Sequence, residues 1–132
     1  MAEIDLLIEP RGEAGSERAV LEVAGDIDLF TAPQLRHAVN ELIDAGSRKL
    51  VVDLTKVGFL DSTGLGVLVG ALKRLRDSGG DLVLAAPQRP VRRVLSVTGL
   101  DKVFTIHTDP TESQISGAGV TQVGDATAVR RS

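Results

Sequence analysis

The segment Asp61-Ser62-Thr63-Gly64-Leu65-Gly66 carries the residues of this sequence that are best placed for chemistry. It follows an apolar run and precedes an amphipathic stretch, so we expect Ser62 at or beside the first residue of a helix, where backbone N–H groups lack partners. A phosphate on its hydroxyl would add about −1.5 to −2 charges, and the helix dipole and free amides favour an anion there. The segment therefore predicts a phosphorylation site that changes the surface without unfolding the chain. A simple capping hydroxyl is the alternative interpretation.

Two more acidic residues, Asp26 and Asp28, follow a predicted strand near the N-terminus. If their loop lies at the same edge of the fold as Asp61, a phosphate on Ser62 would complete a strongly negative patch. An acidic partner surface would then be repelled. The pattern predicts that modification of this serine weakens the contact with such a partner.

Alternating strand and helix patterns must position these loops. Strands are predicted at 4–8, 19–23, 50–54, 82–86 and 103–106, and helices between Thr31 and Gly46, from Leu65 to Leu75, and between Pro90 and Gly99. Thr31 and Gln34 form a capping-box pattern, and the apolar run at 50–54 is typical of a central strand buried on both faces. This order predicts an α/β fold with a mixed, mostly parallel β-sheet, an antiparallel N-terminal strand and packed helices.

The length of 132 residues fits one compact domain. We assign residues 1–115 to that domain, with a candidate short helix at 109–115. Residues 116–132 are rich in Gly, Ser, Thr and Ala and keep no apolar period, which predicts a flexible C-terminal tail.

The composition argues against several classes of protein. The chain has no cysteine, which removes disulfides and thiolate metal sites and fits a reducing cytoplasm. Its first ten residues lack a leader pattern, and no apolar stretch approaches a membrane span. A formal charge of −3 and the absence of Trp and Tyr argue against direct nucleic-acid binding. We therefore expect a cytoplasmic protein with no cofactor, no metal, no direct nucleic-acid contact and no membrane contact.

The segment Asp61–Gly66 resembles the phosphorylation motif of bacterial anti-sigma-factor antagonists, which form the STAS family. Three further segments agree with this family in order and spacing. They are Gly25-Asp26-Ile27-Asp28, the strand Leu50–Leu54 and the helix Val91–Leu100 with its Gly-Leu end. Four such segments in one order form a specific signal, and the resemblance runs from about Ile4 to Ile106.

The resemblance implies a switch protein that is not an enzyme. Its unphosphorylated form would bind an anti-sigma factor with ATP-dependent serine kinase activity and so free a sigma factor. Phosphorylation would end the interaction, and a serine phosphatase would reset it. Carried over to this sequence, Ser62 is the phosphoacceptor and Thr63 a secondary candidate. The partner-binding residues implied are Asp26, Asp28, Asp61, Ser62, Gly64 and Leu65.

Other functions are compatible with parts of the sequence. A phosphorylation-independent STAS scaffold, in a stress-sensing or lipid-transport assembly, stays open. Asp53 follows a buried strand as the phosphoacceptor of a receiver domain would, but no acidic pair follows the first strand, so we expect Asp53 to bond backbone amides instead. A serine hydrolase needs a base near Ser62, and the contexts of His37 and His107 match no such enzyme.

The sequence contains two smaller patterns, one of glycines and one of arginines. Glycines at 64, 66 and 70 form no complete nucleotide-binding loop, and we expect them to pack closely against a neighbouring strand. Arg89, Arg92 and Arg93 form a basic cluster that either touches an acidic partner or solvates an exposed helix face.

Overall fold

The computed structural model describes residues 7–11 and 17–108, and the predicted helix at 109–115 and tail at 116–132 lie outside the described residues. The elements follow in the order β1 (Leu7–Arg11), β2 (Arg18–Ile27), α1 (Ala32–Asp44), β3 (Lys49–Leu60), α2 (Ser62–Asp77), β4 (Asp81–Ala85), α3 (Arg89–Val97), the short 3-10 helix η1 (Leu100–Lys102) and β5 (Thr105–His107). The predicted alternation of strands and helices is confirmed.

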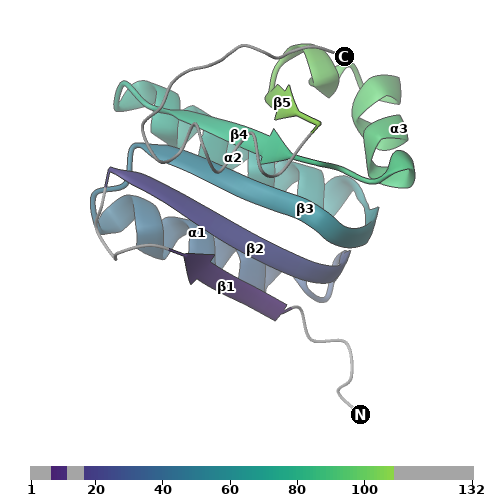
Figure 1. Ribbon diagram of the computed structural model, residues 1–132, viewed down its shortest axis with the longest axis horizontal. Helices are drawn as coiled ribbons and strands as arrows, with labels where there is room; N and C mark the ends of the chain where they lie inside the picture. Colours follow the sequence, from purple (N-terminus) through teal and green to yellow (C-terminus); the bar gives the residue numbers. More distant parts are fainter. Residues whose placement is uncertain (1–6, 12–16, 109–132) are drawn as a thin grey trace.

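The strands form one five-stranded sheet in the order β1-β2-β3-β4-β5 (Figure 1). β1 is antiparallel to β2, whereas β2, β3, β4 and β5 are mutually parallel. The mixed, mostly parallel sheet predicted from the sequence is therefore confirmed. Because the parallel strands share one direction, the loops that follow them all leave from the same edge of the sheet, which we call the carboxyl edge.

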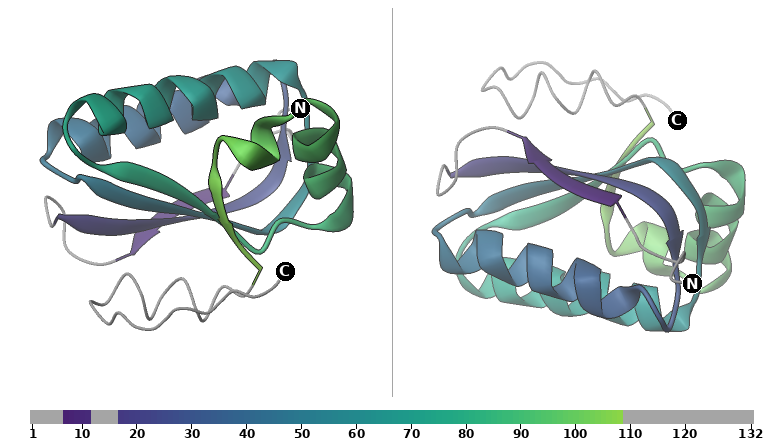
Figure 2. Two further views of the ribbon diagram at one scale, coloured as in Figure 1. Left: turned by 90° about the horizontal axis from the view of Figure 1, so that it is seen from above. Right: turned by 90° about the horizontal axis from the view of Figure 1, so that it is seen from below.

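The helices form a layer over the sheet. Figure 2 shows α1 and α2 side by side over one face, while α3 and η1 lie together near β5. One apolar core joins α1, α2 and the sheet, and it includes Leu35, Leu68 and Leu72. The run Leu50–Leu54 is buried at every residue, as predicted for a central strand.

β3 is longer than its apolar run predicted. It continues to Leu60 beside β2, and two register shifts between Glu22 and Asp26 keep the two strands paired. The exposed residues Thr55 and Lys56 interrupt the hydrophobic pattern without ending the strand, because backbone pairing with β2 continues past them. The extension carries the residues before Ser62 to the far end of β2.

The start of α1 differs from the capping-box prediction. Thr31 is the N-cap residue, but its side chain makes no capping hydrogen bond. Its hydroxyl instead donates to the Asp26 carbonyl at 2.7 Å and accepts from the Asp28 amide at 2.9 Å. The prediction was wrong in its contacts because the hydroxyl bonds to the preceding loop rather than to the helix.

Candidate functional site

The loops that carry Asp26 and Ser62 meet at the carboxyl edge. Ile27 pairs with Leu60 at the ends of β2 and β3. One residue later the Asp61 amide donates to the Ile27 carbonyl at 3.1 Å. The negative patch predicted from the sequence requires the two loops to share one edge, and the structure brings them together there.

Asp61, and not Ser62, caps α2. The Asp61 residue is extended, and its Oδ1 accepts hydrogen bonds from the amides of Thr63 at 2.9 Å and Gly64 at 3.1 Å. Ser62 is the first helical residue and is exposed. Its hydroxyl makes no hydrogen bond to the described part of the chain. The interpretation of Ser62 as the capping hydroxyl is therefore wrong, because the neighbouring carboxylate already fills that role.

Gly64 allows the first turn of α2 to lie directly on the ends of β2 and β3. A Cβ atom at this position would come within 2.5 Å of Ile27 Cγ2 and 2.6 Å of Leu60 Cδ1. The predicted close packing is confirmed here. It is wrong for Gly66 and Gly70, which are exposed and would have open space around a Cβ atom.

Leu65 lies in the core with a side chain only 7% exposed, and Gly64 is buried as well. Both residues were expected on the partner surface, but their burial leaves little of either for direct contact. Both residues belong to the packed first turn of α2, which carries Ser62.

The two acids of the β2–α1 loop have different roles. Asp28 organises the loop, since its Oδ1 accepts from the amides of Phe30 at 2.9 Å and Thr31 at 3.1 Å. Asp26 is exposed at the end of β2, opposite Phe59 of β3. Asp26, Asp28 and Asp61 thus all place carboxylates at the edge that carries the serine segment.

Three large apolar side chains at the same edge were missed from the sequence. Leu29, Phe30 and Phe59 are 62%, 72% and 48% exposed, and we call them the apolar rim. Two of the chain's three phenylalanines thus lie at the surface, Phe30 in the loop after β2 and Phe59 next to the last residue of β3. Exposed apolar groups gathered in one place mark interaction surfaces. The available signal was Leu29-Phe30 within a loop, where apolar pairs have no core to face.

The residues considered for other chemistry lie in ordinary structural positions. The Asp53 carboxylate accepts from the Thr55 amide at 3.0 Å, which confirms the expected backbone bond. The exposed His37 ring lies 3.2 Å from Glu41, one helical turn away on α1. His107 is the last residue of β5, and Gly64–Gly66 belongs to a helix rather than to a phosphate loop.

The described residues, 7–11 and 17–108, contain neither a metal-binding cluster nor a membrane-spanning helix. No group of three or more His, Asp or Glu residues in these ranges is arranged to hold a metal ion. No helix within them has the length and apolar character to cross a membrane.

Comparison with known proteins identifies the family. The family model of the STAS domain matches residues 11–115. An anti-sigma-B factor antagonist of Listeria monocytogenes is 38% identical over 94 residues, which cover 71% of this chain and 82% of the relative. The crystal structure of an anti-sigma factor antagonist from Mycobacterium paratuberculosis is 28% identical, with a TM-score of 0.76 over 89% of this chain and 97% of that one.

A more distant structure agrees in its fold alone. The anti-sigma factor antagonist SpoIIAA in its unphosphorylated form is 20% identical, with a TM-score of 0.74 over 88% of this chain and all of the other. The chain therefore belongs to the STAS-domain family of anti-sigma-factor antagonists, whose role is regulatory rather than catalytic. The resemblance stated from four sequence segments is confirmed.

Proposed function

We propose that this chain is an anti-sigma-factor antagonist switched by phosphorylation of Ser62. Its unphosphorylated form binds an anti-sigma factor that is also an ATP-dependent serine kinase, and this binding frees a sigma factor. The observation that carries the proposal is the exposed Ser62 hydroxyl at the first residue of α2, which makes no hydrogen bond to residues 7–11 or 17–108 because Asp61 caps the helix. A phosphate can therefore be added to this hydroxyl without the loss of a hydrogen bond to the described residues.

Because Asp61 caps α2, a phosphate on Ser62 would keep its charge exposed at the surface. Free amides at a helix start ordinarily bind and partly neutralise a phosphate. Here the amides of Thr63 and Gly64 already bond to the Asp61 carboxylate, and that of Leu65 bonds to the Asp61 carbonyl. These amides would therefore not neutralise the charge of phosphoserine, about −1.5 to −2, and a docked partner would face that charge.

The neighbouring groups set the direction of the switch. Asp26 and Asp61 lie at the same edge, so a phosphate concentrates negative charge there. Burying a phosphate in an interface without a cation to receive it costs several kcal/mol, on the order of a hundredfold or more in affinity. Phosphorylation of Ser62 therefore weakens the complex.

The apolar rim is proposed to supply the attraction that the phosphate opposes. Burial of an exposed phenylalanine side chain is worth about 1.5–3 kcal/mol. Phe30, in the loop after β2, and Phe59, near the end of β3, are the larger members of the rim. A partner that covers the rim must also come close to Ser62. Phosphorylation of Ser62 therefore affects the same contact from which the partner gains its binding energy.

Ser62 is a better acceptor than Thr63. Ser62 is exposed, whereas Thr63 is half-buried and its amide is held by Asp61. The proposed kinase uses ATP, and a serine phosphatase resets the switch. We therefore expect the cycle to run in the cytoplasm. No catalytic activity of the chain itself is part of the proposal.

The test is intact mass measurement with site mapping after incubation with ATP and each candidate anti-sigma kinase of the native host. Wild type and Thr63→Ala should each gain one phosphate at Ser62, and Ser62→Ala should gain none. A phosphate retained by Ser62→Ala would move the switch to Thr63. No phosphate on any protein across the full kinase panel would contradict the proposal and favour a phosphorylation-independent scaffold.

A further inference from the structure

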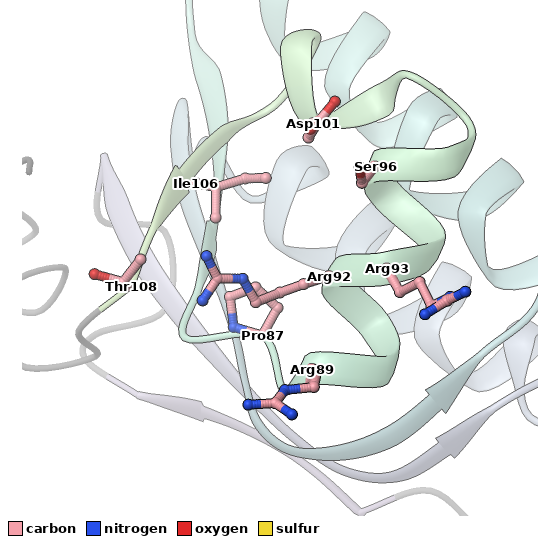
Figure 3. A pocket seen from close by; sticks show the side chains of 8 residues that line it. All are labelled: Pro87, Arg89, Arg92, Arg93, Ser96, Asp101, Ile106 and Thr108. Atoms are coloured by element: carbon pink, nitrogen blue, oxygen red, sulfur yellow. The ribbon is translucent and has the colours of Figure 1, made fainter. Parts of the chain in front are cut away.

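A second surface feature lies away from the serine segment, where a hollow of about 730 Å³ separates the outer face of α3 from the end of β5 (Figure 3). Arg89, Arg92 and Arg93 line it from the helix, and Ile106 and Thr108 line it from β5 and the residue that follows. The volume is in the range of small-molecule sites, about 300–1,000 Å³. The basic cluster noted in the sequence therefore lines a concave site rather than a flat helix face.

The helical spacing explains why the arginines share one side of α3, although Figure 3 shows Arg93 extending away from Arg92 and Thr108. Arg89, Arg92, Arg93 and Ser96 follow one another at intervals of three, one and three residues, which places them on one side of α3. Val91 and Leu95 lie on the other side, and both are fully buried. Packing of the apolar face into the core thus directs the basic face outward into the hollow.

Among the described residues, the positive charge of the hollow is only partly balanced by acids. None of the three arginines forms an ion pair within the described ranges, whereas Arg74 and Arg76 pair with Asp44 at 2.9 Å and Asp81 at 3.1 Å. Of the acids in the described part of the chain, Asp101 lines the hollow. Figure 3 shows Asp101 at the end opposite Arg89, and it shows Arg89 and Arg92 both extending from α3 toward the side of Thr108.

These groups match the chemistry of a phosphate ester. A guanidinium group offers two parallel N–H donors to phosphate oxygens. The hydroxyls of Ser96 and Thr108 add neutral donors, and Pro87 and Ile106 supply an apolar wall for the uncharged part of a ligand. We infer that the hollow between α3 and β5 binds a small phosphate ester, with Arg89 and Arg92 on the phosphate.

The position of the hollow agrees with this inference. α3 begins just after β4 ends, so the hollow lies at the carboxyl edge, where open α/β sheets bind ligands. The Gln88 side chain donates to the Thr55 carbonyl of β3 at 2.8 Å and ties the start of α3 to the sheet. No residue of the hollow belongs to the serine segment or the apolar rim, so this inference does not depend on the proposed function.

The test is an NMR titration of the full chain with adenosine 5′-monophosphate, inorganic phosphate, adenosine and a short glutamate peptide. Saturable shifts of α3 and β5 amides with the monophosphate are expected, with weaker binding of inorganic phosphate and none of adenosine. Arg89→Ala combined with Arg92→Ala should weaken monophosphate binding by roughly tenfold or more. Arg36→Ala combined with Lys73→Ala removes the same charge from exposed sites elsewhere and should leave it unchanged.

Three results would overturn the inference. Equal weakening by both double variants would indicate attraction to net charge and not a site. Equal affinity for the monophosphate and inorganic phosphate would show that the organic part of the ester does not contribute to binding. Tighter binding of the glutamate peptide would instead make the hollow a contact for an acidic protein. Because the arginines are exposed, both double variants should fold, and their amide spectra check this directly.

Discussion

Substitution of Gly64 by alanine tests whether the first turn of α2 lies on the strand ends as described. The new Cβ would come within 2.5 Å of Ile27 Cγ2 and 2.6 Å of Leu60 Cδ1, both closer than carbon atoms approach without strain. The Leu60 methyl can move by rotation of its side chain. Ile27 Cγ2 is attached directly to Cβ in a fully buried side chain, so it moves only if the side chain changes rotamer or α2 shifts.

The expected cost follows from two opposing terms. Overpacking of this kind costs about 1–3 kcal/mol. Replacement of glycine by alanine in a helix contributes about 0.5–1 kcal/mol in the opposite direction. The free energy of unfolding should therefore fall by up to about 2.5 kcal/mol in Gly64→Ala. Urea denaturation followed by circular dichroism measures it, with an unchanged m-value expected.

Gly66→Ala is the matched control, because Gly66 lies two residues later in the same helix with open space around it. This variant should be more stable than wild type by up to about 1 kcal/mol. Equal effects of the two substitutions, or a stabilised Gly64→Ala, would refute the close contact between α2 and the strand ends. A shifted helix start should also slow phosphorylation of Ser62, which the kinase assay measures separately.

The remaining predictions concern the surface and the cap. Asp61→Ala should lower the free energy of unfolding by about 0.5–2 kcal/mol in urea denaturation, since two amides lose their acceptor; wild-type stability would contradict the cap. Ser62→Glu should weaken binding to the anti-sigma partner at least roughly tenfold in calorimetry, whereas Ser62→Ala without ATP should bind as wild type. Phe30→Ser combined with Phe59→Ser should also weaken binding by roughly tenfold or more. Val97→Ser, at an exposed site on α3, should not change it, and equal losses would exclude the rim as the contact.

Much of the architecture was predictable from local patterns. Apolar periodicity separated strands from helices, and the alternation predicted a parallel sheet with an antiparallel first strand, as found. The length of β3 was not predictable from its apolar run. Its last residues stay in the strand through pairing with β2, which depends on backbone partners distant in sequence.

Capping was harder to predict, because several polar side chains compete for the same amides. Thr31 had the pattern of a capping box, yet its hydroxyl bonds to the loop that Asp28 organises. Ser62 and Asp61 both lie at the start of α2, and the Asp61 carboxylate accepts the hydrogen bonds of the two free amides. A carboxylate accepts charge-assisted hydrogen bonds that are stronger than those of a hydroxyl, which explains the outcome but requires the backbone geometry to be known.

The sequence by itself determined the alternation of elements, the place of Ser62 at the start of a helix and the motif that marks the STAS family. All of these depend on residues close together along the chain. Only the tertiary structure decided that Asp26 lies at the edge that carries Ser62, that Phe30 and Phe59 remain exposed there, and that the arginines of α3 line a hollow. The physical reason is that exposure and proximity follow from the order of strands in the sheet and from which helix face the core buries, and neither is encoded within a single segment.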